Sequence, residues 1–464
     1  MNGRVSLLGA GPGDPELLTL IGKRRLNEAD VVLYDRLIDP SLLAFTSEDA
    51  SLINVGKMPL HHKVKQSKIN EMLVDYAKSG KKVVRLKAGD PYVFGRGGEE
   101  AQVLQEQGIN FEIIPGITSA IAGLAAAGIP ITHRDYASSF HVITGHHKKD
   151  GQQLDWANIA GQEGTLVFLM GMAQLPNICR QLVSHGKNKE TPVAIIQWAT
   201  QWRQKMAIGD LSNIVKVVNE KKLSSPALIV VGDVVKLSGQ LSVSKPLAGV
   251  HVLVPYSQRQ RLFNSLVDLG ATADFYRRAS LESTTVKLPS LSSYSTILFD
   301  DFPAYQRFIQ LLVDSGQDLR ALAGKRILAR NKVVARHLKK QGLLVDDIAT
   351  LNQLAGQILE VGGEDAFYKG TDFLNLYHRQ RQEKVLPFEL TEFNAVIFPS
   401  TASLRDFTAA LDSKQIKQLK DITAFVMGQS IDDLARKVNF KKVVNCQPNV
   451  EATIKQVKEE LTGD

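Results

Sequence analysis

Four loops of the N-terminal half combine glycine, proline and small or polar residues, and each lies at the carboxyl end of a probable strand. They read "GAGPGDP" (Gly9–Pro15), "VGKMPLHH" (Val55–His62), "AGDPYVFGRGG" (Ala88–Gly98) and "PGITSAIAG" (Pro115–Gly123). Such residues leave backbone N–H and C=O groups open, so these loops suit a ligand that is bound by the backbone. The carboxyl ends of parallel strands meet at one sheet edge, where ligands of α/β proteins bind. The four loops therefore predict one shared binding site.

The opening loop lacks the residues that bind phosphate. A dinucleotide fingerprint requires a glycine where Asp14 stands, and a carboxylate there would repel a pyrophosphate. No Gly-Lys-Ser/Thr sequence follows, which excludes a P-loop. Asp14 is expected to cap the next helix instead, with Pro15 at the first helical position. These residues alone leave open a strand-to-helix turn that binds no ligand.

The elements that must position these loops alternate between strands and helices, which predicts an α/β fold. Amphipathic spacing predicts helices over Gln66–Lys78 and Glu99–Gln107. The expected strands of the first half are Val5–Leu8, Val31–Tyr34, Val83–Leu86, Phe111–Ile114, His141–Thr144, Leu166–Met170, Val193–Gln197 and Ala227–Val231.

The chain of 464 residues is too long for one ordinary domain. The polar stretch Leu237–Pro246 is typical of a linker and is followed by a new expected strand, His251–Val254. We therefore expect one domain over residues 1–240, with lobes of about 1–115 and 116–240, and a second over residues 247–464. Within the second, Ile297–Phe308 and Val396–Phe407 share a strand, a break and a helix, which indicates either duplicated α/β units or chance similarity.

The net charge of +8 favours an anionic partner. No dense Lys/Arg stripe interleaved with aromatic residues is present, so a small polyanionic molecule is expected and a nucleic acid is not. The uncharged stretch Ile113–Ile131 is interrupted by Pro115, Gly116 and Pro130. It predicts a buried helix of small residues, and no membrane segment.

The two cysteines, Cys179 and Cys446, lie far apart in the sequence. They indicate a reducing compartment, hence a cytoplasmic protein, and no disulfide framework. The histidines His133, His146 and His147 lack Cys or Asp partners at ligand spacing, so no metal site is expected.

An ordered set of motifs over Met1–Lys236 closely resembles the uroporphyrinogen-III C-methyltransferases of the tetrapyrrole methylase superfamily. The motifs are "GAGPGDPELLTL", "VVLYDRLI", "VGK", "RLKAGDPYVFGRGGEE", "PGITSAIAGLAAAGIPITHRDYASS", "TGH" and "SPALIVVGDVV". The resemblance implies two α/β lobes with S-adenosyl-L-methionine in the cleft between them. It implies methylation of uroporphyrinogen III at C2 and C7 to precorrin-2 by a homodimer. A later precorrin methylase is an alternative, which "DRL", "GRGG" and "THRDYASS" argue against.

The resemblance also implies roles for individual residues. Asp35 would accept a proton and Lys57 would donate one, although alone Asp35 fits a helix cap or a partner of Arg36, and Lys57 a surface lysine. Arg96 would clamp substrate carboxylates, and Arg134, His61 and His62 would face the same cleft. The implied cofactor-binding residues are Pro12, Ala88, Gly89, Asp90, Val93, Thr118, Ser119, Met170, Ala199 and Ala227.

Three positions depart from the pattern of that family. Ala88 and Ala199 stand where glycine is usual, and Met58 replaces a frequent arginine. A β-carbon at Ala199 would either tighten the cofactor site or clash if φ is positive.

Residues 247–464 resemble uroporphyrinogen-III synthase, through "VHVLVP", "VIFPSTASLRDF", "FVMGQS" and "VVNCQPNVEATIKQVKEEL". The resemblance implies two α/β lobes joined by a two-stranded hinge around an open cleft, which closes hydroxymethylbilane. Ser400, Thr401 and Ser430 would bind propionates, or equally cap helices. "VPYS", "FDDF" and "LARNKVVARHL" depart from the synthase pattern, so an active synthase and a non-catalytic tetrapyrrole-binding or docking module both remain open.

Overall fold

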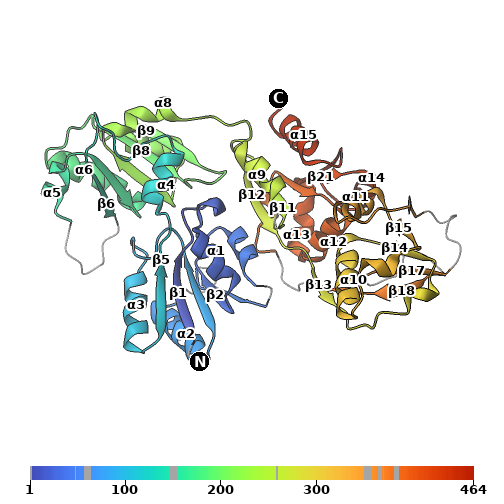
Figure 1. Ribbon diagram of the computed structural model, residues 1–464. Helices are drawn as coiled ribbons and strands as arrows, with labels where there is room; N and C mark the ends of the chain where they lie inside the picture. The colour runs from blue at the N-terminus through green and yellow to red at the C-terminus, as the bar shows by residue number, and fades with distance from the viewer. Residues whose placement is uncertain are drawn as a thin grey trace. The chain divides into compact units, whose positions relative to one another are not determined.

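The computed structural model describes residues 3–47, 49–56, 64–145, 154–257, 260–349, 357–363, 368, 370–380 and 386–463. Its contacts divide the chain into two compact units, one of Met1–Arg277 with Leu386–Asp464 and the other of Arg278–Val385. The described residues form four five-stranded sheets and a two-stranded ribbon. Helices pack beside the larger sheets (Figure 1), which confirms the α/β class.

The first sheet carries the predicted loops at its carboxyl edge. All its strands are parallel, because each pairs in register with neighbours that run in the same direction. Their order is β3 (Ser51–Asn54), β2 (Val31–Tyr34), β4 (Lys82–Lys87), β1 (Arg4–Gly9) and β5 (Asn110–Ile114).

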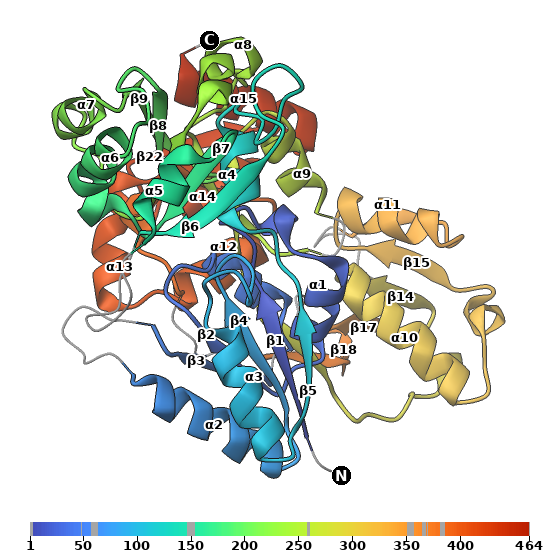
Figure 2. The ribbon, with the colours of Figure 1, turned by 90° about the vertical axis from the view of Figure 1, so that its left-hand side faces the viewer.

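Alternate side chains of β1 point to opposite faces of the first sheet, so each face needs its own helices. Leu7 packs with α2 (Gln66–Lys78) and α3 (Gly97–Glu106), whereas Leu8 packs with α1 (Leu20–Asn27) and the 3-10 segment η2 (Pro40–Phe45). Figure 2 shows α2 and α3 together beside this sheet. The predicted helix Gln66–Lys78 has these same bounds in the structure.

The second sheet is mixed. Strands β6 and β7 are parallel, and the remaining pairs are antiparallel. The order is β6 (Phe140–Thr144), β7 (Thr165–Leu169), β10 (Ala227–Val231), β8 (Pro192–Gln197) and β9 (Lys205–Asp210). One face packs on α5 (Trp156–Gly161), α6 (Leu175–Ser184) and α7 (Ile214–Glu220), and the other on α4 (Ser119–Ala126) and η4 (Asp233–Leu237).

The small-residue stretch forms the predicted helix as α4, of eight residues, but the helix is only partly buried, through Ala120, Gly123 and Leu124. Throughout the described ranges, each helix is too short or too polar to cross a lipid bilayer. The expected linker Leu237–Pro246 is only partly irregular, because η4 continues into α8 (Ser238–Leu241). Leu237 and Ser238 are buried, which the polar composition of this stretch did not indicate.

A third, parallel sheet belongs to the same compact unit as the first two. Its order is β12 (Thr272–Tyr276), β11 (His251–Pro255), β20 (Ala395–Phe398), β21 (Thr423–Met427) and β22 (Lys442–Cys446). Its helices are α9 (Arg261–Asp268), α12 (Thr401–Ala409), α13 (Ser413–Gln418), α14 (Gln429–Ala435) and α15 (Val450–Thr462).

The second unit has its own parallel sheet. The order is β16 (Asp347–Ile348), β15 (Arg326–Ala329), β14 (Thr296–Phe299), β17 (Ile358–Gly362) and β18 (Asp372–Asn375), with helices α10 (Phe302–Asp314) and α11 (Lys332–Lys340). Strands β13 (Ser280–Ser283) and β19 (Tyr377–Gln380) form an antiparallel ribbon. The two similar segments of the sequence thus supply the central strands of two different sheets, β14 and β20.

The first and third sheets meet around buried polar groups. His251 Nε2 lies 2.8 Å from Asp274 Oδ2, and Arg277 Nη2 donates to the carbonyl oxygen of Leu43 at 2.6 Å. Burial raises the pKa of Asp274 to about 7 and lowers that of His251 to about 4. Burial also holds the pKa of the nearby Asp39 carboxyl well above its usual range. The contact therefore favours uncharged forms of these groups.

Wild-type protein should lose stability as the pH rises toward about 7, and Asp274→Asn should make that loss smaller. The pKa of Asp274 is higher in the folded chain than in the unfolded chain, so its stabilisation is complete at low pH and falls as pH approaches about 7. Asparagine does not titrate, whereas His251 titrates in both proteins. The free energy of unfolding of the variant relative to wild type should therefore rise by about 1 kcal/mol per pH unit between about pH 5 and 7.

Denaturant unfolding of both proteins across this pH range measures that difference. Asp268→Asn is the matched control, because Asp268 is exposed on α9 and should show a constant difference. A constant difference for Asp274→Asn as well would contradict the raised pKa.

Candidate active site

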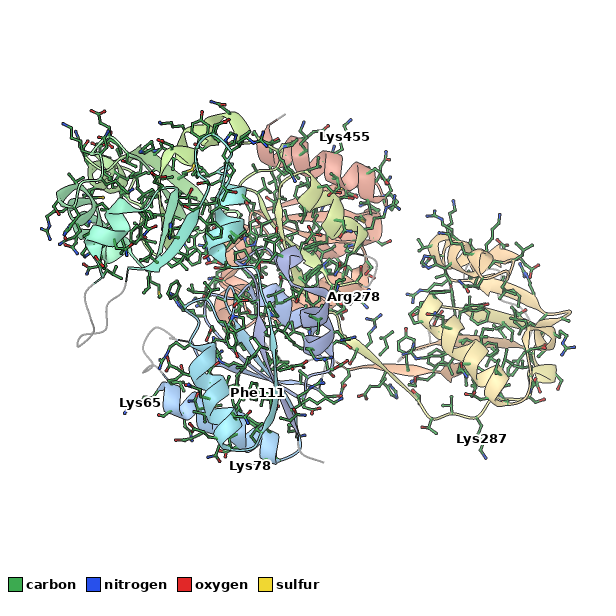
Figure 3. The ribbon with its side chains drawn as sticks, turned by 60° about the vertical axis from the view of Figure 1, so that its left-hand side comes forward. Lys65, Lys78, Phe111, Arg278, Lys287 and Lys455 are labelled. Atoms are coloured by element: carbon green, nitrogen blue, oxygen red, sulfur yellow. The ribbon has the colours of Figure 1, made fainter. Side chains whose placement is uncertain are left out.

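A cavity of about 770 Å³ lies between the first and second sheets, within one compact unit. From the first sheet it is lined by the segments that follow β1, β2, β3 and β4, and from the second by residues at the ends of β7, β8 and β10. The N-terminus of α4 contributes Thr118 and Ser119. Lys65, the residue before α2, also lines the cavity. Figure 3 labels Lys65 and Lys78 at the opposite ends of that helix. Segments far apart in the sequence therefore share one cavity.

Most of the predicted site residues of the N-terminal half line this cavity. They are Pro12, Asp35, Ala88, Gly89, Asp90, Val93, Arg96, Thr118, Ser119, Met170, Ala199 and Ala227. Arg134 is exposed and does not line it. Lys57, Met58, His61 and His62 lie outside the described residues.

Backbone contacts bind three of the loops together. Gly89 N donates to Gly11 O at 2.8 Å, and Gly11 N donates to Gly89 O at 3.2 Å. Asp90 Oδ2 accepts from Gly116 N at 3.0 Å, which joins the loops after β4 and β5. A β-carbon at Gly116 would overlap Gly89 O and would lie 2.7 Å from Gly9 Cα. Glycine is therefore required for this close approach of backbones.

Asp14 has the capping role that the sequence predicts. Its side chain accepts from Glu16 N at 2.9 Å, and Pro15 begins the 3-10 helix η1 (Pro15–Leu17). Asp14 N also donates to Thr200 Oγ1 at 3.2 Å, which connects the opening loop to the second lobe. The two contacts of Asp14 thus hold the opening loop beside the cavity, and neither involves a phosphate-binding group.

Unusual backbone conformations concentrate at the cavity. Among the described residues, seven that are not glycine have positive φ, and four of these, Phe94, Arg96, Met170 and Trp198, line it. Such conformations cost on the order of 1–3 kcal/mol and cluster at functional sites. No residue type in the sequence signals them, so the sequence could not have indicated this strain.

Asp35 is held by an arginine that the sequence analysis did not identify. Arg85 Nη2 donates to Asp35 Oδ1 at 2.6 Å, and the Arg85 side chain is only 3% exposed, against 32% for Asp35. Arg36, the partner suggested by sequence proximity, also lines the cavity. The carboxylate is therefore fixed at one oxygen while part of the side chain remains accessible.

A buried cluster of charged groups lies behind Asp35. Arg85 and Lys87 lie two residues apart on β4, and both contact Glu100 Oε1, at 3.2 and 3.0 Å. Burial, together with the neighbouring Arg85, lowers the pKa of Lys87. The sequence offered one sign of this cluster, since two basic residues stand in "VVRLK" within a strand that is otherwise apolar.

Arg96 is paired in the structure. Its Nε and Nη2 donate to the two carboxylate oxygens of Glu99 at 3.0 and 2.6 Å, and its side chain is 55% exposed. An exposed ion pair is weak, so an anionic ligand can exchange with Glu99 at little cost.

The two alanines that replace glycine fit the site. Neither Ala88 nor Ala199 is among the described residues with positive φ, so the anticipated backbone clash at Ala199 does not occur. Ala199 is buried and packs in the core that contains α4.

The three predicted substrate-binding residues of the C-terminal half lie apart from this cavity. Ser400 caps α12, where its side chain accepts from Ser403 N at 3.1 Å in a capping box. Thr401 is the first residue of α12, and Ser430 is exposed at the start of α14. The helix-cap alternative therefore holds for Ser400 in this structure. Within the described residues, no three His, Cys, Asp or Glu side chains gather as metal ligands.

A two-lobed α/β protein with a glycine-lined cavity at its strand ends matches a known class. The family model "Tetrapyrrole (Corrin/Porphyrin) Methylases" matches residues 4–215. The uroporphyrinogen-III C-methyltransferase of Bacillus subtilis is 44% identical over 355 residues, which cover 75% of this chain and 73% of that protein. The chain belongs to the uroporphyrinogen-III C-methyltransferase family of the tetrapyrrole methylases.

Two further similarities cover different parts of the chain. The porphyrin biosynthesis protein HemD of Ruminiclostridium josui is 34% identical over 497 aligned positions, 99% of this chain and 98% of that protein. The crystal structure of the Thermus thermophilus uroporphyrin-III C-methyltransferase, complexed with S-adenosylhomocysteine, is 39% identical. The match covers 50% of this chain and 99% of the Thermus thermophilus chain, with a TM-score of 0.44.

Proposed function

We propose that this protein transfers methyl groups from S-adenosyl-L-methionine to C2 and C7 of uroporphyrinogen III, giving precorrin-2. The observation that carries the proposal is the single cavity lined by Asp35, by the three joined glycine loops and by the second lobe. Membership of the family supports the same reaction.

The lining of the cavity fits S-adenosyl-L-methionine. Leu169, Ile196 and Leu228 offer apolar surface, and the bare backbone at Gly11 and Gly89 allows close approach. These residues, with Pro12, Asp90, Thr118, Met170 and Ala199, would hold the cofactor. When bound, the cofactor supplies a methyl group already activated by its sulfonium. The task of the protein is therefore to orient the two reactants and to exclude water.

The residues of the first lobe supply the remaining chemistry. A pyrrole carbon that gains a methyl group would leave its ring cationic, so a group of the protein must then remove a proton. Asp35 accepts the proton that restores the neutral ring, and its fixed carboxylate suits this role. Lys57 is proposed as a proton donor. Arg36 and Arg96 attract the carboxylates of the substrate.

For the C-terminal half we propose the cyclisation of hydroxymethylbilane to uroporphyrinogen III. The parallel α/β sheets of residues 251–446 and the full-length similarity to the HemD protein support this activity. A non-catalytic module is a second candidate, supported by Asp300 at the carboxyl end of β14. Burial and the neighbouring Glu360 raise the pKa of Asp300 to about 8, and this buried carboxyl group belongs to "FDDF", one of the segments that depart from the synthase pattern.

Incubating the full chain with hydroxymethylbilane and S-adenosyl-L-methionine tests both halves. We expect a dimethylated product of the type III isomer, identified by mass and by chromatography of the isomers. A parallel reaction supplied with uroporphyrinogen III measures methylation alone. Methylation only in the parallel reaction would make the C-terminal half non-catalytic, and methylation in neither would refute the proposed function.

A further inference from the structure

The buried charged cluster behind Asp35 has no role in the reaction described so far. We propose that Glu100 is a positioning residue for methyl transfer, which acts through Arg85 on the carboxylate of Asp35. The proposal rests on the proposed function, because it takes Asp35 as the proton acceptor.

Glu100 fixes several groups at once. Its side chain is 0% exposed, and its Oε1 accepts from Arg85 Nε at 3.2 Å and from Lys87 Nζ at 3.0 Å. Gln66 Nε2, from α2, donates to the same oxygen at 2.9 Å. Glu100 therefore ties α3 to the two cations of β4 and to α2.

Arg85 transmits this constraint to Asp35. Its Nη1 donates to the carbonyl oxygens of Leu33 and Leu86 at 3.4 and 3.2 Å, while Nη2 donates to Asp35 Oδ1 at 2.6 Å. With Nε on Glu100, all three guanidinium nitrogens are bound, so the planar group has one orientation. The orientation of Asp35 toward the cavity follows from that of Arg85.

Charge balance makes Glu100 necessary in a second way. Arg85 and Lys87 are both buried, and within the described part of the chain the carboxylates of Glu100 and Asp35 form their ion pairs. Without the charge of Glu100, two desolvated cations would act on Asp35 alone, which would make its carboxylate a weaker base. Glu100 thus preserves the ability of Asp35 to accept a proton.

Glu100→Gln tests the proposal, since glutamine keeps the size and an acceptor oxygen but removes the charge. We expect kcat for methyl transfer to fall by about tenfold or more, because a displaced base loses much of its general-base contribution. The affinity for S-adenosylhomocysteine and the KM for uroporphyrinogen III should stay within about twofold of wild type. Glu106→Gln, on the exposed end of the same helix, is the matched control and should retain wild-type kcat.

A double variant separates positioning from simple stabilisation. If Glu100 acts through Asp35, adding Glu100→Gln to Asp35→Asn should lower the residual single-turnover rate by less than about twofold. Full additivity would overturn the proposal, as would a wild-type kcat in Glu100→Gln. An Asp35→Asn variant that keeps wild-type activity would instead refute the proposed role of Asp35.

Arg85→Lys decides the matter if Glu100→Gln fails to fold. Lysine keeps the positive charge but cannot reach the carboxylates and carbonyl groups with three nitrogens. We expect the same fall in kcat with unchanged affinity for S-adenosylhomocysteine. Wild-type kcat in Arg85→Lys would show that this connection does not position Asp35.

Discussion

Asp35→Asn is expected to lower kcat for methyl transfer by about 10³-fold, a size typical of a lost general base. Asparagine keeps the shape of the side chain and an oxygen that can accept from Arg85 Nη2, so the buried guanidinium retains a partner. Only the charge and the basicity are removed. The loops proposed to bind the cofactor do not depend on Asp35, because they are joined by contacts of Gly11, Gly89 and Asp90. Binding of S-adenosylhomocysteine should therefore be unchanged.

Single-turnover methylation of uroporphyrinogen III measures the first effect, and calorimetric titration with S-adenosylhomocysteine measures the second. Asp75→Asn provides a control, since Asp75 lies exposed on α2 and away from the cavity. Retention of more than about a tenth of wild-type kcat by Asp35→Asn would show that another group takes the proton.

The sequence predicts the strands and loops of the N-terminal half well, because local signals determine them. Val31–Tyr34 is a fully apolar run ended by a charged residue, and it forms β2 with those bounds. Gly11 and Gly89 stand at strand ends, where only a tight turn explains glycine and proline together. The resemblance then named most of the residues of the N-terminal half that the structure places around one cavity.

The sequence does not predict what depends on long-range contact. Arg85 and Glu100 meet because β4 and α3 pack together, and a separation of fifteen residues carries no spacing signal for that pairing. The positive φ of Met170 and Trp198 occurs at two residues of the second lobe that line the cavity, and neither residue type signals it in the sequence. Part of the expected linker is helical, and its polar residues gave no sign that Leu237 is buried.

Gly116→Ala is expected to abolish cofactor binding, with a loss of affinity for S-adenosylhomocysteine of at least about 100-fold. Its β-carbon would overlap Gly89 O and approach Gly9 Cα, and both neighbours are backbone atoms that cannot rotate away. The loops after β1, β4 and β5 would have to separate. That displacement would also break the bond from Gly116 N to Asp90 Oδ2 and misplace several groups of the cavity together.

Gly98→Ala is the matched control, because a β-carbon at Gly98 meets no atom within 4 Å and the residue lies in the first turn of α3. It should bind S-adenosylhomocysteine as wild type does, and alanine should favour the helix slightly. Circular dichroism would show whether Gly116→Ala keeps its secondary structure. A folded Gly116→Ala protein with wild-type affinity would mean that the loops separate freely, and that their close backbone contact does not build the cofactor site.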